Sequence, residues 1–241
     1  MGEGRIRIGL IGCGRIVARH LDVLGALEQF ELVSVCDLDA ERARRAAATC
    51  GVRAYTDYLE MLEREHLDAA TVLTESGSHV DVAVAAASHV RTLIIEKPMA
   101  LTLESADRLI EVCERNRTRL FVVKQNRYNP PVLRLREALE AGRFGKLVLG
   151  TVRVRWCRRQ DYYDQDSWRG TWKQDGGVFA NQASHHVDLL QWGDDQQLQV
   201  ELGETVRVVT KTIGDATVEI WDANRRAGLF QKAFGKAIEI V

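Results

Sequence analysis

The chain has 241 residues, of which 46% are hydrophobic and 28% are charged, and its formal net charge is -1. This composition is typical of a soluble globular protein and excludes a disordered or fibrous one. The balanced charge gives no indication of a nucleic-acid partner or of an anionic membrane surface, and no apolar run is long enough to span a bilayer.

Short apolar strands alternate with helices over the first half of the chain. Strands are predicted over 6–11, 31–36, 69–74, 92–95 and 120–123. Helices are predicted over 15–27, 40–50, 80–87 and from Leu103 onward, the last with Leu103, Ala106, Ile110 and Cys113 on one face. Asp39 is expected to cap the second helix and Gly51 to end it. This alternation indicates a doubly wound parallel sheet of the Rossmann type over residues 1–123.

The alternation of short apolar strands with helices ends after residue 123, where we place a domain boundary. A helix is expected over 132–141, and residues 147–156 alternate as an antiparallel strand with one face in water. Another helix follows Gly176-Gly177, and 205–212 and 216–221 have the pattern of strands. The prediction for residues 124–241 is an α+β domain with a mostly antiparallel sheet.

The first strand runs into a glycine turn, Gly12-Cys13-Gly14-Arg15-Ile16. Gly12 permits a tight turn, and Gly14 lets a pyrophosphate approach the backbone at a helix N-terminus. A plain strand–turn–helix connection is the alternative, because Val17 stands where the fingerprint usually has Gly or Ala. Asp37 ends the second strand 25 residues after Gly12, where a carboxylate accepts ribose hydroxyls and repels a 2′-phosphate. Together these residues predict binding of NAD in preference to NADP.

Further polar side chains suit catalysis on a hydroxyl group. Lys97 follows a buried strand at the edge where such sheets bind ligands, although a lone lysine there is more often a surface residue. Asn181, His185 and Asp188 share one face of the later helix, so His185 suits an acid–base role. We interpret His186 as structural. A metal site is discounted, because adjacent histidines point to different faces of a helix.

The stretch 162–172 is dense in aromatic and polar residues, and four arginines precede it, at positions 153, 155, 158 and 159. It can line a pocket for a polar ligand, with the arginines receiving phosphate or carboxylate groups, or be a loop packed by its own tryptophans. The five cysteines form no C-x-x-C pair, which indicates free thiols. With no apolar signal region at the N-terminus, a cytoplasmic protein is expected.

These motifs, in this order, resemble the Gfo/Idh/MocA oxidoreductase family. The resemblance rests on the glycine turn with Asp37, on the loop 74–79, on Glu96-Lys97-Pro98, and on Gly176-Gly177 leading to Asn181 and His185. It implies catalytic roles for Lys97, His185 and Asn181, the last at a position often held by Asp. It implies cofactor contacts from Gly12, Cys13, Gly14, Arg15, Ile16, Asp37, Thr74, Ser76, His79, Glu96, Lys97, Gln125, Trp168 and Arg169.

Within the family, the stretches 122–130, 162–172 and 181–190 are similar to the UDP-N-acetyl-2-amino-2-deoxyglucuronate dehydrogenases, which serve bacterial surface polysaccharide and lipopolysaccharide O-antigen synthesis. That similarity implies NAD-dependent oxidation at C3 of a UDP-linked N-acetylglucosaminuronic acid. It also implies 2-oxoglutarate as a hydride acceptor and a homo-oligomer, dimer or tetramer. The implied substrate-binding residues are Lys97, Arg127, Arg155, Tyr163, Asn181 and His185.

The resemblance runs from about Ile6 to Trp192 and does not extend over the last 49 residues. Two alternative hypotheses therefore stay open. One is a dehydrogenase for a free sugar or an inositol-like polyol. The other is a catalytically inactive NAD-binding or assembly protein whose shortened second sheet leaves an apolar face and an edge uncovered.

Overall fold

The computed structural model describes residues 4–145, 152, 154, 156–193, 198–202, 206–210 and 238–240. The chain forms two compact units, one of Met1–Val123 with Arg158–Gln182 and one of Lys124–Cys157 with Ala183–Val241. One break between the units lies between Val123 and Lys124, and residues 158–182 group with the first unit. None of the helices in the described ranges is long and apolar enough to cross a bilayer.

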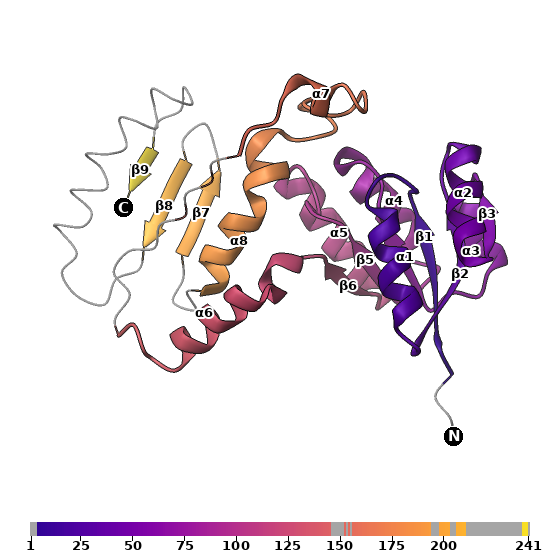
Figure 1. Ribbon diagram of the computed structural model, residues 1–241, viewed down its shortest axis with the longest axis horizontal. Helices are drawn as coiled ribbons and strands as arrows, with labels where there is room; N and C mark the ends of the chain where they lie inside the picture. Colours follow the sequence, from indigo (N-terminus) through magenta and orange to yellow (C-terminus); the bar gives the residue numbers. More distant parts are fainter. Residues whose placement is uncertain are drawn as a thin grey trace. The chain divides into compact units, whose positions relative to one another are not determined.

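The first unit contains a six-stranded sheet in the order β3-β2-β1-β4-β5-β6, with every neighbouring pair parallel. This confirms the predicted α/β Rossmann sheet. Figure 1 labels β1, β2, β3, β5 and β6 of this sheet. The expected strands lie within two residues of their predicted bounds. β3 and the helix after it were missed, because this short edge strand has no apolar run. The strands are β1 (Ile6–Ile11), β2 (Phe30–Cys36), β3 (Arg53–Tyr55), β4 (Ala69–Val72), β5 (Thr92–Ile95) and β6 (Arg119–Val122).

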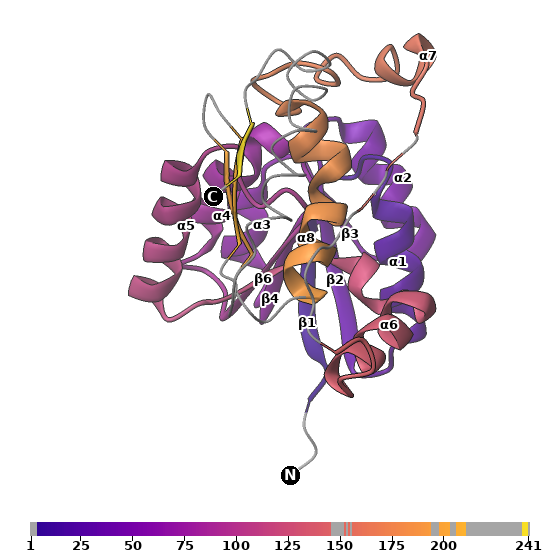
Figure 2. The same ribbon diagram turned by 90° about the vertical axis from the view of Figure 1, so that its left-hand side faces the viewer.

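Helices cover both faces of this sheet (Figure 2). On one face α1 (Val17–Ala26) and α2 (Ala40–Cys50) bury Val17, Leu21, Ala46 and Ala47 against Ile8, Leu10 and Val35. On the other face lie α3 (Tyr58–Arg64), α4 (His79–Ala86) and α5 (Leu103–Asn116). Their core side chains include Met61, Leu62, Val80, Ala83, Leu109 and Cys113, which pack with Ile11, Val72, Leu93 and Ile95 of the sheet.

The helix ends of α2 confirm the prediction from sequence. Asp39 accepts hydrogen bonds from the backbone N–H groups of Glu41 and Arg42, and Gly51 ends the helix with a φ of 68°. Of the residues predicted to share one face of α5, Cys113 is buried but Leu103 and Ile110 are not. Leu103 is 81% exposed and Ile110 41% exposed, whereas Leu109 and Cys113 are buried. Leu109 and Cys113 are four residues apart and share a face, and α5 packs on that face.

The strand order reverses between β1 and β4, so the chain leaves these two strands toward opposite faces. In parallel sheets of this kind, the carboxyl ends beside such a reversal form the ligand-binding crevice. The glycine turn follows β1, Asp37 follows β2, Thr74 follows β4, and Glu96 with Lys97 follows β5. The sheet topology therefore gathers these side chains along one edge.

The segment 158–182, called the strap below, contains the short helix α7 (Gln160–Tyr163) and most of a π-helix over Phe179–Ala183. In the second unit lie a 3-10 turn (Gln125–Tyr128), α6 (Pro130–Glu140) and α8 (Ser184–Gly193). Its strands β7 (Leu198–Leu202) and β8 (Val206–Thr210) are antiparallel, and β9 (Ile238–Ile240) is parallel to β8. The strand expected over 216–221 lies outside the described residues. Of 147–156 only Val152, Val154 and Trp156 are described, and none of the three belongs to a strand.

Candidate functional site

The glycine turn has one tightly packed and one open position. Gly12 has a φ of 104°, and a Cβ there would lie 2.7 Å from the carbonyl carbon of Leu73. A Cβ on Gly14 would meet no atom within 4 Å. No side chain caps α1 at Ile16, and in its first turn the N–H groups of Val17 and Arg19 bond to the backbone carbonyls of Gly14 and Ile16. The turn therefore fits the pyrophosphate of a dinucleotide beside Gly14.

Asp37 is bound into this turn. Its Oδ2 accepts the N–H of Cys13 at 2.7 Å, and its Oδ1 accepts the N–H of Asp39 at 2.8 Å. A carboxylate has about four acceptor positions, so two remain for ribose hydroxyls. Burial, with a contribution from the charge of Asp37, raises the pKa of the Cys13 thiol to about 12, so the turn holds a neutral thiol at physiological pH.

The strap contacts the glycine turn and the start of α2. Arg15 donates a hydrogen bond to the side chain of Gln165. Arg42 lies 3.5 Å from a carboxylate oxygen of Asp39 and 3.9 Å from one of Asp166. These contacts bring strap residues next to the expected adenosine half of the cofactor site.

Trp168 and Arg169, both expected to contact the cofactor, pack on each other. The Arg169 guanidinium lies 4.5 Å from the Trp168 ring centre and 4.8 Å from that of Tyr162. It also donates to Asp166 at 2.8 Å and to the Tyr162 hydroxyl at 2.9 Å. Stacking and ion pairing hold the guanidinium in one orientation.

His79 joins the two loops that follow β4 and β5. It is 1% exposed, and its ring nitrogens lie 2.7 Å from the carbonyl oxygen of Pro98 and 2.9 Å from that of Thr74. Burial lowers the pKa of the imidazole, against the opposing effect of the two carbonyls. Thr74 in turn accepts a hydrogen bond from the Ser78 hydroxyl at 2.8 Å, and Ser76 is buried in the same turn. His79 thus links the loop after β4 to the backbone directly after Lys97.

Glu96 has a partner that sequence reasoning missed. Its Oε1 lies 3.0 Å from Nε2 of His20 on α1, and its Oε2 accepts the N–H of Lys97 at 3.1 Å. Burial raises the pKa of Glu96, but the bond and charge of His20, together with Lys97, outweigh this and lower it overall. No local signal identifies this pair, because its members are 76 positions apart.

Lys97 and Asn181 are brought together. The Lys97 ammonium donates to the Asn181 backbone carbonyl at 2.8 Å and to its side-chain oxygen at 3.1 Å. Asn181 is itself buried and donates its amide N–H to Asp175. Lys97, at the end of β5, is therefore held in place by a residue of the strap. An ordinary surface lysine has no such contact.

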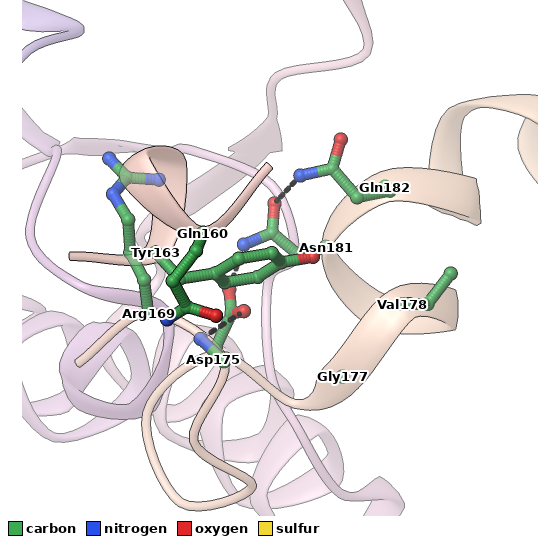
Figure 3. Close-up of a pocket in the computed structure, with 9 residues that line it drawn as sticks. Gln160, Tyr163, Arg169, Asp175, Gly177, Val178, Asn181 and Gln182 are labelled. Atoms are coloured by element: carbon green, nitrogen blue, oxygen red, sulfur yellow. Dashed lines mark hydrogen bonds between the residues drawn. The ribbon is translucent and has the colours of Figure 1, made fainter. Parts of the chain in front are cut away.

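A pocket of about 430 Å³ lies beside this contact (Figure 3). In Figure 3, Asn181 and Asp175 point toward each other and the Tyr163 ring lies across the pocket. Tyr163, expected to bind substrate, therefore shares a cavity with the partner of Lys97. The lining residues are Gln160, Tyr163, Arg169, Gly170, Asp175, Gly177, Val178, Asn181 and Gln182.

The second unit holds the other residues expected at the site. His185 is 7% exposed, and its Nε2 lies 3.5 Å from the amide nitrogen of Gln125. Arg127 donates two hydrogen bonds to Asp188, at 2.8 and 2.7 Å, and Lys124 lies 3.5 Å from the same carboxylate. Arg127 therefore has its charge matched by a buried carboxylate that was not predicted as its partner.

Two further expectations concern histidine 186 and arginine 155. The His186 ring packs edge-on against Trp156, with 5.3 Å between ring centres, and its interpretation as structural stays a prediction. Arg155 lies outside the described residues. Within the described ranges, no group of three or more His, Cys, Asp or Glu side chains could hold a metal ion.

Two family models match the chain. An oxidoreductase family with an NAD-binding Rossmann fold matches residues 6–124, and the GFO/IDH/MocA C-terminal domain matches residues 132–220. The chain belongs to the Gfo/Idh/MocA family. Its first unit is accordingly an NAD-binding Rossmann domain. The second match corrects the expectation that family resemblance ends near Trp192, since it extends to residue 220.

Solved structures of the family include two close in sequence. The WlbA dehydrogenase from Bordetella pertussis, in complex with NADH and UDP-GlcNAcA, is 41% identical with a TM-score of 0.72, covering 78% of this chain and 58% of that one. Its counterpart from Chromobacterium violaceum, also in complex with NADH and UDP-GlcNAcA, is 36% identical with a TM-score of 0.73, covering 80% of this chain and 56% of that one.

Curated Gfo/Idh/MocA relatives have other substrates in their names. The myo-inositol 2-dehydrogenase of Thermotoga maritima is 28% identical over 88% of this chain and 61% of its own length. The D-apiose dehydrogenase of Paraburkholderia graminis is 35% identical over 63% of this chain and 40% of its own length. The chain thus spans about half the length of the curated relatives it matches.

Proposed function

We propose that this chain is an NAD-dependent oxidoreductase that oxidises the C3 hydroxyl of UDP-linked N-acetylglucosaminuronic acid. The observation that carries the proposal is the contact of Lys97 with Asn181 at the edge of an NAD-binding sheet. The substrate is supported by the two WlbA relatives, at 41% and 36% identity, whose structures contain NADH and UDP-GlcNAcA. The proposed place of the reaction is bacterial surface polysaccharide synthesis.

Each residue has a separate role in the proposed reaction. NAD, when bound, supplies the acceptor for the hydrogen that leaves the carbinol carbon with its electron pair. Lys97, oriented by Asn181, donates a hydrogen bond to the substrate oxygen. His185 takes the hydroxyl proton, so that the alcohol becomes a ketone. Asp37 binds the ribose hydroxyls of the cofactor.

The remaining partners are part of the same proposal. Arg127, Arg155 and Tyr163 contact the charged and polar groups of the substrate, and Gln125, Trp168 and Arg169 contact the cofactor. 2-Oxoglutarate serves as the acceptor that regenerates NAD, and the enzyme works as a homo-oligomer in the cytoplasm. Arg127 is supported in this role by its fixed geometry, since Asp188 holds its guanidinium by two bonds.

The direct test is incubation of the protein with UDP-N-acetylglucosaminuronic acid, NAD and 2-oxoglutarate, with mass spectrometry of the sugar nucleotide. We expect a 3-keto product, two mass units lighter than the substrate. Lys97→Met and His185→Ala should each lower the rate by roughly 10²- to 10⁴-fold, the usual contribution of a positioned proton-transfer group. Lys173→Met, which removes an exposed lysine of the strap, should leave the rate unchanged.

A second candidate is oxidation of a free polyol, favoured by the match to a myo-inositol 2-dehydrogenase over 88% of this chain. Incubation with inositols and free sugars, monitored by NADH absorbance, separates the two candidates. Turnover of a polyol with no 3-keto sugar nucleotide would replace the first proposal by the second. NAD-dependent thermal stabilisation without turnover of either class would leave the inactive NAD-binding protein.

A further inference from the structure

The proposed reaction does not use Asp175, although its carboxylate is among the most buried acidic groups described. Asp175 is 5% exposed and stands directly before the Gly176-Gly177 turn. One oxygen accepts the backbone N–H of Gly170 at 2.9 Å, and the other accepts the side-chain N–H of Asn181. No lysine or arginine in the described part of the chain forms an ion pair with it. A buried carboxylate of this kind usually depends strongly on its hydrogen-bond donors.

Asn181 separates two opposite charges. Its side-chain oxygen accepts from the Lys97 ammonium at 3.1 Å, and its side-chain nitrogen donates to Asp175. An ammonium can only donate and an ionised carboxylate can only accept, so the amide has one orientation that satisfies both neighbours. An Asp at position 181 would instead place two carboxylates against each other in a buried site.

We propose that Asp175 is a positioning residue for Lys97, acting through Asn181. Its negative charge fixes the amide with the oxygen toward Lys97, and the polarised amide favours the charged ammonium. This inference rests on the proposed function only where it makes Lys97 the group that binds the substrate oxygen.

Asp175→Asn tests the proposal, because it removes the charge and keeps the size of the side chain. Competitive labelling of the free protein with acetic anhydride between pH 7 and 11, followed by mass spectrometry of the Lys97 peptide, measures the pKa of Lys97 without substrate. Loss of a nearby negative charge should lower this pKa by about one unit. Asp161→Asn, an exposed acid of the same strap, makes the same charge change and should leave the profile in place.

Exchanging the two side chains gives the second arm. Asn181→Asp alone should lower the melting temperature at neutral pH, because it pairs two buried carboxylates. The double variant Asn181→Asp with Asp175→Asn places the carboxylate directly on Lys97, so the pKa of Lys97 should equal or exceed that of the wild type. If the wild type is active, the dependence of kcat on pH should shift in each variant in the same direction as the labelling profile of that variant. The KM for NAD should stay constant.

Three results would overturn the proposal. The first is a labelling profile of folded Asp175→Asn that coincides with that of the wild type. The second, decisive if Asp175→Asn does not fold, is a folded double variant with a Lys97 pKa below that of the wild type. The third is failure of both Asp175→Asn and the double variant to fold, which would show that Asp175 acts in folding alone. Failure of the wild type to turn over the sugar nucleotide would overturn the proposed function and leave the labelling result standing.

Discussion

Single residues at the carboxyl edge of the sheet differ in what surrounds them, and the two glycines of the turn show this most clearly. Gly12 lies against the backbone after β4, whereas a side chain on Gly14 would project into open space. The first is constrained by the fold and the second by the ligand that the turn accepts. The two positions can therefore be separated by substitution.

Gly12→Ala should destabilise the protein, because it adds a Cβ 2.7 Å from the Leu73 carbonyl carbon at a φ of 104°. Positive φ alone costs a non-glycine residue about 1–2 kcal/mol, and the clash adds to this. Gly14→Ala should unfold like the wild type in urea but bind NAD more weakly, as measured by titration calorimetry. Wild-type NAD affinity in Gly14→Ala would contradict the placement of the pyrophosphate.

At the scale of elements, the strap is attached to the Rossmann sheet by close backbone contact as well as by Arg15 and Arg42. Gly77 in the turn after β4 donates its N–H to the Gln174 carbonyl at 3.0 Å. A Cβ on Gly77 would lie 2.4 Å from the carbonyl oxygen of Lys173. The strap thus lies directly on a loop expected to contact the cofactor.

Gly77→Ala should therefore displace the strap. We expect faster tryptic cleavage between Arg158 and Lys173, and weaker NAD binding, with the rest of the sheet intact. Gly25→Ala is the matched control, because a Cβ on this helical glycine meets no atom within 4 Å. Alanine there should raise helix stability by up to about 1 kcal/mol. Equal cleavage rates in the two variants would show that the strap does not depend on this contact.

The elements also show what sequence could predict. Periodicity and end signals were sufficient for β1, for α2 with Asp39 and Gly51, and for β5, because the information is local. They failed for β3, which has no apolar run, and did not identify the buried face of α5, which neighbouring helices decide. Lys97 and Asn181 were singled out separately, but their hydrogen bond was not foreseen. The bond from Asn181 to Asp175 was not foreseen either, because an aspartate before two glycines resembles any turn. The roles of the individual site residues stay predictions.

For the whole molecule, the two buried titratable groups beside Lys97 predict how stability depends on pH. The pKa of His79 is lowered from an ordinary value of 6.5, so the unfolded chain binds a proton that the folded chain does not. The free energy of unfolding should therefore fall as pH drops below about 6.5. The pKa of Glu96 is also lowered, from an ordinary 4.5, so its contribution is present above that pH and is lost only below it.

Urea unfolding at pH 7.5, 6.0 and 5.0 separates His79 from Glu96, because of these two groups only His79 has its ordinary pKa inside this range. His79→Gln should reduce the dependence of the urea midpoint on pH, whatever its effect at pH 7.5. His89→Gln, which replaces an exposed histidine, should keep the wild-type dependence. A slope in His79→Gln equal to that of the wild type would assign the acid sensitivity to other groups.

The strap also has a consequence for synthesis on the ribosome. All six strands of the first sheet are encoded before residue 124, yet the segment that covers the turn after β4 is translated only after residues 124–157. The nascent chain therefore carries a finished sheet whose cofactor edge is still uncovered, and Lys97 without Asn181. NAD that binds at this stage would meet the glycine turn and Asp37 alone, and the site would gain its remaining contacts as translation proceeds past residue 182.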